Sequence, residues 1–221
     1  MLSLAVMFLS GFFHGIAGFG FPMIATPLLS LMGSVQSAVL ATLLPTMAVN
    51  FFTIKTMRNG FSVVQRFWLL AVCIIIGSWS GTQLLVLNPT EIYKLLLAAV
   101  IILYLIREKL HLTLGDSVQR FFWPMMVFFG LLSGIVSGLV NVMIPILIIY
   151  VLELKLEKNI SIALMNFCFL SSKVTQVITF STLGVFGKDE LLLAVPAVGV
   201  ALIALHLGKR FHEKISASLY K

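Results

Sequence analysis

Residues 10–27 read SGFFHGIAGFGFPMIATP, and residues 130–146 read GLLSGIVSGLVNVMIPI. Each segment lies inside a longer stretch without Asp, Glu, Lys or Arg, Met1–Gly33 in the first case and Phe121–Leu152 in the second. At 1.5 Å per residue either stretch would make a helix of about 50 Å, too long for a hydrocarbon core of roughly 30 Å. Neither is long enough for two full spans and a turn. The two stretches therefore predict an unusual membrane element.

The glycines and prolines of both stretches predict helices that are broken inside the membrane. Gly and Pro weaken a helix interior and free backbone groups, which are tolerated in a membrane only where protein buries them or a wet cavity meets them. Close helix packing through small residues is the alternative. Two similar stretches in corresponding positions favour the broken helix, which is the pattern of repeat-built transporters. The residues expected to form the breaks are Gly15, Gly18, Gly20, Pro27, Gly134, Gly138 and Pro145.

The rest of the chain has the composition of a membrane protein built from helices. Of its 221 residues, 60% are hydrophobic and 10% are charged, whereas a soluble domain carries about 25% charged residues. We therefore predict an all-α, polytopic integral membrane protein. Its ordinary spans are expected at roughly Val35–Ile54, Phe67–Leu87, Glu91–Ile106, Lys158–Leu183 and Leu191–Leu207.

An internal repeat is indicated by the order of these elements and by two alignments. Pro27 and Pro145 lie 118 residues apart, and GTQLLVLNPTEIYK (81–94) aligns with GKRFHEKISASLYK (208–221) at an offset of 127. The sequence thus predicts a first membrane repeat over 1–107, a connecting loop over 108–120 and a second repeat over 121–221. The first half continues after Lys94 into a last span. The second half is expected to lack the equivalent helix.

The positions of Lys and Arg suggest how the stretches cross the membrane. If every stretch crosses once, the basic residues divide almost evenly between the two sides, and no orientation follows. If each broken stretch enters and leaves on one side, nearly all of them share a face. These are Lys55, Arg58, Arg66, Arg107, Lys109, Arg120, Lys155, Lys158, Lys209, Arg210, Lys214 and Lys221, with Lys94 and Lys188 opposite. Loop Lys and Arg mark the cytoplasmic side, which predicts a cytoplasmic C-terminus and inverted repeats.

Lys173 is the candidate centre of a binding site. It lies 15 residues after Lys158 and 11 before Gly184, so about 15–20 Å of helix separates it from either end. A lysine at this depth costs on the order of 2.5–3.5 kcal/mol to insert. The acidic residues all lie in loops or at span ends, so the expected partners of Lys173 are backbone carbonyls, polar side chains or an anionic substrate. A structural lysine facing a polar crevice is the alternative.

Several neutral polar residues could complete that site. Asn166 and Gln176 lie on the same predicted helix as Lys173, and Asn50 lies on a helix face with Thr42 and Thr46. Polar residues in membrane helices also make ordinary interhelical hydrogen bonds, which is the preferred interpretation of Thr42 and Thr46. The broken segments add His14, Ser137 and Asn141, near half-helix N-termini that could attract an anion. His14 could carry a proton, although a hydrogen-bonded packing role is preferred.

Other classes of protein find little support. The net charge of +7 is spread over short loops, where membrane proteins keep positive charge, so nucleic acid is not an expected partner. No Cys/His spacing typical of a metal site occurs, and no paired carboxylates, G-x-S-x-G or HExxH pattern indicates an enzyme. We expect no metal and no cofactor. The expected partners are the lipid bilayer and a small anion, and a homo-oligomer is compatible with the sequence.

The glycine patterns resemble those of the TauE/SafE family of membrane proteins. They are Gly11-x3-Gly15-x2-Gly18-x-Gly20-x6-Pro27 near the start and Gly134-x3-Gly138-x6-Pro145 at mid-chain, within a two-repeat layout. The resemblance implies a plasma-membrane permease for sulfite, sulfoacetate and related sulfur-containing anions. Alternating access around a site between the halves is the expected mechanism. A membrane scaffold that does not transport is the alternative, because the second half is expected to lack a helix.

Overall fold

The computed structural model describes residues 1–57, 63–110 and 117–219, and these residues are almost entirely helical. Among these described residues, five helices are long and apolar enough to cross a membrane, at Val35–Thr56, Gln65–Leu87, Phe122–Val140, Lys158–Thr182 and Glu190–Lys214. This confirms the predicted all-α polytopic class. The helices are α1 (Leu2–Ala17), α2 (Phe21–Ser30), α3 (Val35–Thr56), α4 (Val63–Leu87), α5 (Ile92–Leu110), α6 (Ser117–Arg120), α7 (Phe122–Val140), α8 (Ile144–Glu153), α9 (Lys158–Thr182) and α10 (Lys188–Leu219).

The outer faces of these helices carry large apolar side chains. Leu95 of α5 is 71% exposed, Ile178 of α9 is 59% exposed and Ile203 of α10 is 61% exposed. The buried residues, by contrast, include many polar side chains. A surface of this kind is stable against lipid and would be unusual on a soluble monomer.

Both charge-free stretches form the broken helices that the sequence predicts. The first consists of α1 and α2, and the second consists of α7 and α8. Each break opens with a residue in the left-handed conformation, Gly18 (φ 84°) after α1 and Asn141 (φ 63°) after α7. Glycine and asparagine adopt this conformation most readily. Each new helix then starts with a proline in its first turn, Pro22 in α2 and Pro145 in α8, where its missing N–H has no cost.

The residues expected to form the breaks divide into two groups. Gly18, Gly20 and Pro145 lie at a break. Pro27 does not, because it lies inside α2, and the proline that corresponds to Pro145 is Pro22. Three glycines also lie within helices: Gly15 in α1, and Gly134 and Gly138 in α7. Their role is helix packing, the alternative that the sequence left open.

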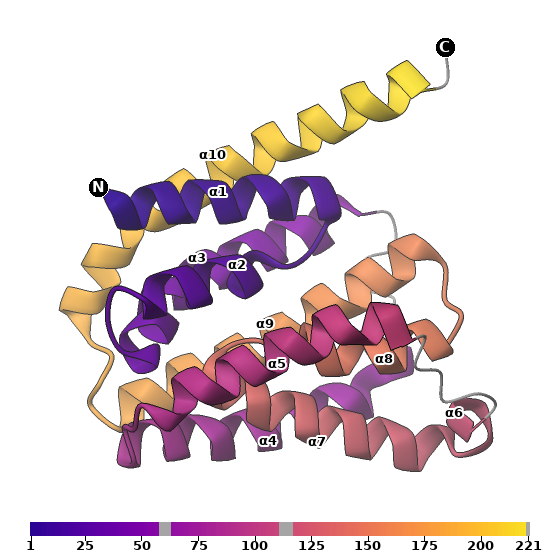
Figure 1. Ribbon diagram of the computed structural model, residues 1–221, viewed down its shortest axis with the longest axis horizontal. Helices are drawn as coiled ribbons and strands as arrows, with labels where there is room; N and C mark the ends of the chain where they lie inside the picture. The colour runs from indigo at the N-terminus through magenta and orange to yellow at the C-terminus, as the bar shows by residue number, and fades with distance from the viewer. Residues whose placement is uncertain (58–62, 111–116, 220–221) are drawn as a thin grey trace.

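Two glycine-lined helix pairs, α1 with α10 and α4 with α7, form the tightest contacts of the fold. A Cβ atom on Gly15 would lie 2.4 Å from the Leu205 carbonyl oxygen of α10, and one on Gly138 would lie 2.6 Å from the Ser78 carbonyl oxygen of α4. Only glycine lets the backbones approach this closely. In Figure 1 the first pair forms the upper edge of the molecule and the second pair forms the lower edge.

The two pairs are built alike. Gly11 and Gly134 are 123 residues apart, as are Gly15 and Gly138. Gly11 meets Ala201 and Ala204 of α10, and Gly134 meets Ile74 and Gly77 of α4. These partners are offset by 127 residues (201 − 74 and 204 − 77), the offset of the sequence alignment. The contacts support the predicted repeats, which remain a prediction.

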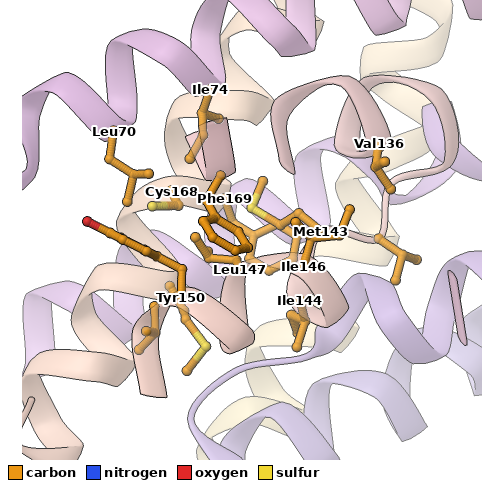
Figure 2. Packing of buried hydrophobic residues seen from close by; sticks show 14 of the residues in the cluster. Leu70, Ile74, Val136, Met143, Ile144, Ile146, Leu147, Tyr150, Cys168 and Phe169 are labelled. Atoms are coloured by element: carbon orange, nitrogen blue, oxygen red, sulfur yellow. The ribbon is translucent and has the colours of Figure 1, made fainter. Parts of the chain in front are cut away.

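The buried apolar residues form two clusters, and these define two bodies. A smaller cluster joins α1, α2, α3 and α10, which we call the α1 body. A larger cluster joins α4, α5, α7, α8 and α9, which we call the α7 body, and it also includes Val35, Val39 and Leu43 of α3 and Val118 of α6. Figure 2 shows the larger cluster, with Tyr150 of α8 beside Leu70 of α4 and Phe169 of α9 near Leu147. Each body combines helices from both predicted repeats, and α3 meets α9 between them.

The helix ends lie as expected if each broken stretch enters and leaves on the same side. In Figure 1, α3 ends, α9 begins and α10 ends toward the side of the C-terminus, whereas α10 begins toward the side of the N-terminus. Lys55 in the last turn of α3 and Lys158 at the start of α9 therefore share a side, and Lys188 at the start of α10 lies on the other. Arg58 and Lys221 lie outside the described residues. Which side faces the cytoplasm stays a prediction.

Candidate functional site

Lys173 is fully buried in the middle of α9 and is held by two side-chain amides. Its Nζ donates hydrogen bonds to Oδ1 of Asn141 and to Oε1 of Gln176. Both acceptors are neutral, so these contacts solvate the cation without cancelling its charge. Asn141 comes from the break between α7 and α8, whereas Gln176 lies one turn further along α9.

The two amides are oriented by their own hydrogen bonds. Nδ2 of Asn141 donates to Oγ1 of Thr26 and to Oγ1 of Thr42, both at 2.8 Å. Nε2 of Gln176 donates to the Ser137 carbonyl oxygen at 2.9 Å. With each NH2 group engaged, each amide oxygen points to the ammonium group. The surroundings of Lys173 are therefore preorganised for positive charge.

A chain of serine hydroxyls adjoins this network. Oγ of Ser172 lies 2.8 Å from Oγ of Ser137 and 2.9 Å from Oγ of Ser78. All three residues are fully buried, on α9, α7 and α4. Ser78 lies between Gly77 and Gly81, whose missing side chains let α4 and α7 approach each other. The glycine contacts thereby bring hydroxyl groups together beside Lys173.

The network lies on the boundary between the two bodies. Asn141 belongs to the α7 body, and its two hydroxyl acceptors, Thr26 on α2 and Thr42 on α3, belong to the α1 body. Oγ1 of Thr42 donates in turn to the Ala38 carbonyl oxygen at 2.8 Å, so its lone pairs face Asn141. Movement of one body against the other would change the partners of Asn141, and with them the surroundings of Lys173.

The first break is held by His14 and Asn166. Nδ1 of His14 accepts the N–H of Phe21, the first residue of α2, at 3.3 Å, and Nε2 lies 3.1 Å from Oγ1 of Thr53. Accepting at Nδ1 leaves the proton on Nε2, so the geometry describes a neutral imidazole that caps α2. Nδ2 of Asn166 donates to the Gly18 carbonyl oxygen at 2.7 Å. This hydrogen bond also crosses between the bodies.

Removing this cap is expected to destabilise the protein. His14→Ala would leave a buried N–H of α2 without its acceptor, which costs about 1–3 kcal/mol. The measurement is the thermal unfolding of the purified protein in detergent. His206→Ala is the matched control, because His206 is exposed on α10. Equal unfolding temperatures for the two variants would contradict the capping role.

Asn50 lies on α3 between the two breaks. Its Nδ2 donates to the Thr46 carbonyl oxygen at 2.8 Å. Its Oδ1 is buried without a hydrogen-bond partner among the described residues, as is Oγ1 of Thr46. On the same face, Thr42 bonds Asn141 at one break and Thr53 bonds His14 at the other. The α3 helix thus carries a line of polar groups from one break to the other.

The predicted site residues fall into two sets. Lys173, Gln176, Asn141 and Ser137 form one connected network, whereas His14 and Asn166 lie together at the first break. Asn50 contacts neither set directly through a described hydrogen bond. No pattern in the sequence predicts Thr26 or Ser78 as site residues, and Thr53 was not among the predicted residues either. Thr53 follows Asn50 by three residues, one further helical turn on the face that carries Thr42, Thr46 and Asn50, and this spacing could have found it.

A comparison with protein families gives this geometry a context. The family model of the sulfite exporter TauE/SafE matches residues 3–221, which is nearly the whole chain. The chain belongs to the TauE/SafE family. No curated protein and no solved structure matches the chain.

Membership of TauE/SafE agrees with the helices described above. The family consists of membrane transporters of sulfur-containing anions rather than enzymes. The chain is accordingly a multi-pass membrane protein of a transporter family. A buried cation solvated by neutral amides is a suitable feature for such a protein, because an anion would supply the charge that its present partners lack.

Proposed function

We propose that this TauE/SafE protein carries sulfite, sulfoacetate or a related small anion across the cell membrane by alternating access, with Lys173 at the binding site. The observation that carries the proposal is a fully buried lysine with two neutral hydrogen-bond acceptors. Placing such a lysine in a membrane helix costs free energy, and a lysine retained there indicates a functional site. We further infer a cytoplasmic C-terminus from the basic residues at that end.

The donors around Lys173 suit an oxyanion or a sulfonate. An ammonium has three N–H groups, and the two amide contacts use two of them. A bound anion would take the third and could displace an amide oxygen. The hydroxyls of Ser137 and Ser172 are rotatable donors within the same network. The oxygens of a tetrahedral sulfonate or of pyramidal sulfite could accept hydrogen bonds from several of these groups at once.

The positions of the hydrogen bonds between the two bodies support alternating access. At the second break, Asn141 donates hydrogen bonds to Thr26 and Thr42. At the first break, Asn166 donates a hydrogen bond to the Gly18 carbonyl oxygen. Breaking the first set and keeping the second would open Lys173 toward one side, and the reverse would open it toward the other. The moving units would be the α1 and α7 bodies, and α3 of the first would slide along α9 of the second at their boundary.

The second candidate function is a membrane scaffold that binds no anion. It is favoured by the dense hydrogen bonding of Lys173 to the protein itself, which a structural lysine would also show. Anion binding distinguishes the two functions, because a scaffold is not expected to bind sulfite.

The test is thermal unfolding of the purified chain in detergent with increasing anion concentrations. A ligand of the native state stabilises it by RT ln(1 + [L]/Kd), about 2.7 kcal/mol at a hundredfold excess over Kd. Sulfite and sulfoacetate are expected to raise the unfolding temperature, with sodium chloride at matched ionic strength as control. Lys173→Met should lose the shift. Equal shifts with chloride and with the two anions would support the scaffold.

A further inference from the structure

Two cavities lie at opposite ends of the boundary between the α1 and α7 bodies. The larger, about 330 Å³, is lined by the end of α1, the end of α3, the start of α9 and the second half of α10. The smaller, about 130 Å³, is lined by the start of α3, the end of α4 and the start of α5. Because α3 has 22 residues, roughly 33 Å of helix separates the two cavities.

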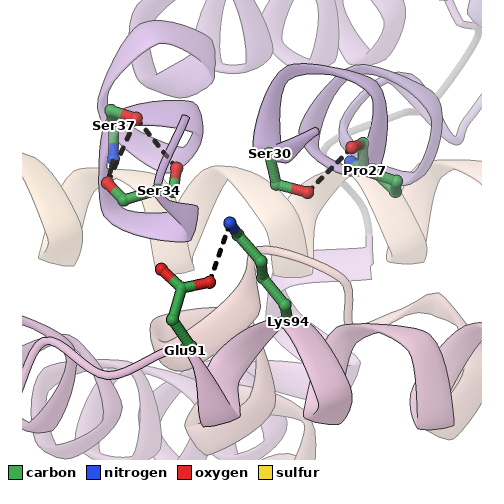
Figure 3. Close-up of polar contacts among 6 residues, drawn as sticks. All are labelled: Pro27, Ser30, Ser34, Ser37, Glu91 and Lys94. Carbon is green, nitrogen blue, oxygen red and sulfur yellow. Dashed lines mark hydrogen bonds and ion pairs between the residues drawn. The ribbon is translucent and has the colours of Figure 1, made fainter. Parts of the chain in front are cut away.

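The two cavities differ in charge. The larger is lined by Lys158, Lys209 and His212 with a single carboxylate, Glu213, and we call it the basic vestibule. The smaller contains Lys94 and Glu91, which form an ion pair of 2.8 Å, and we call it the neutral vestibule. Figure 3 shows this pair facing Ser34 at the start of α3. Of these two cavities, as lined by the described residues, the basic vestibule is the one in which cationic side chains exceed carboxylates.

The basic vestibule adjoins the first break. Its wall includes Gly18, whose carbonyl oxygen binds Asn166, and Ile162, whose carbonyl oxygen accepts a second hydrogen bond from the same amide at 2.8 Å. Thr53, the hydroxyl partner of His14, lies in the wall as well. The vestibule thus ends at the contact that must break for this end to open.

Lys209 is positioned across the basic vestibule. Its Nζ donates to Oγ1 of Thr56 at 2.6 Å, which links α10 to α3. Lys158 enters from the α7 body, at the first position of α9. The cations therefore come from both bodies, and an anion held between them would bridge the boundary. A cleft with charge of one sign and apolar walls concentrates ions of opposite sign.

We propose that the basic vestibule is a second anion-binding site, which collects a small oxyanion or sulfonate before it reaches Lys173. Its role as an access site rests on the proposed transport function, whereas its affinity for anions does not. The neutral vestibule lacks this capacity because Glu91 neutralises Lys94. Loading is therefore favoured from the end with the basic residues, which is the direction of an exporter if that end is cytoplasmic.

The first test measures anion attraction without transport. Met57 lies in the wall of the basic vestibule and Gln36 in the wall of the neutral one. Each is replaced by cysteine in the full chain with Cys73 and Cys168 changed to alanine. Methanethiosulfonate reagents convert a thiol to a mixed disulfide with release of methanesulfinate, and the rates of this reaction with an anionic and a cationic reagent are then compared. We expect the anionic reagent to react several-fold faster than the cationic one in Met57→Cys, and sulfoacetate to slow that reaction, with neither effect in Gln36→Cys.

Variants of the lysines show which side chains cause the preference for the anionic reagent. Lys158→Gln with Lys209→Gln should abolish the preference at position 57, and Lys94→Gln should leave it unchanged. Equal rates of the two reagents at position 57 in the parent, or no protection by sulfoacetate, would overturn the vestibule. In proteoliposomes the double variant should raise KM several-fold from the basic end and keep the maximal rate.

The two proposals fail separately. Protection at position 57 without anion flux by the parent protein would support the vestibule and contradict the transporter. Flux that depends on Lys173, with equal reagent rates at position 57, would support the transporter and contradict the vestibule.

Discussion

Lys173→Met is expected to reduce anion flux to the background of protein-free vesicles. Methionine has a similar length and no charge, so the variant removes the ammonium group and little else. The N–H donors and the positive charge that would hold an anion on the boundary between the bodies are then both absent. The measurement is uptake of labelled sulfite or sulfoacetate into proteoliposomes with equal amounts of inserted protein.

The fold should survive this substitution. Two amide oxygens, on Asn141 and Gln176, lose their donor, which costs about 1–3 kcal/mol for each group that stays unpaired. Against this, the membrane no longer has to accommodate a lysine, which costs about 2.5–3.5 kcal/mol at a helix centre. Lys94→Met is the control, since Lys94 lies at the exposed ion pair. Normal flux by Lys173→Met would place the binding site elsewhere.

Gly208→Ala is expected to be the most destabilising single methyl addition in the fold. A Cβ at Gly208 would lie 2.1 Å from the Phe12 carbonyl oxygen and 3.0 Å from the Gly15 Cα atom. Both neighbours are backbone atoms of α1, so no side-chain rotation relieves the clash and the two helices must separate. Overpacking of this kind costs about 3 kcal/mol or more, which corresponds to a fall of about 6–12 °C in Tm for a chain of this size.

Gly199→Ala provides the matched control on the same helix. Among the described residues, no atom apart from the backbone of α10 itself lies within 4 Å of the Cβ position at Gly199, so alanine there should be neutral or slightly stabilising through its higher helix propensity. Thermal unfolding in detergent and the monodisperse fraction after purification measure both variants. Equal stability of Gly208→Ala and Gly199→Ala would mean that α1 and α10 do not pack through these glycines.

The sequence predicts the broken helices well because their physical signature is local. Thirty residues without charge cannot form one span, and Gly18, Gly20 and Pro145 weaken the helix where it breaks. The same residue type also permits close packing, and composition does not distinguish the two roles. The sequence therefore predicts breaks at Gly15 and Gly138, although each of them packs against a helix that is remote in sequence.

The site was predictable in its chemistry but not in its assembly. A lysine far from either helix end, in a chain whose acidic residues lie in loops, requires neutral partners or an anion. Its partnership with Asn141 depends on the left-handed turn after α7, which places the side chain of Asn141 opposite α9. Thr26 and Ser78 were missed because their contacts with the network span 115 and 94 residues of sequence, and nothing near them indicates such a partner.

The proposed function is the movement of sulfur-containing anions by this TauE/SafE protein through a site between its two bodies. Counterflow in sealed proteoliposomes tests it most directly: vesicles loaded with unlabelled sulfoacetate are diluted into a trace of labelled sulfoacetate. An alternating-access carrier should accumulate the label transiently above its equilibrium level, and Lys173→Met should not. Label uptake that is no faster than in protein-free vesicles, by a parent protein that is folded and inserted, would contradict the transporter and favour the scaffold.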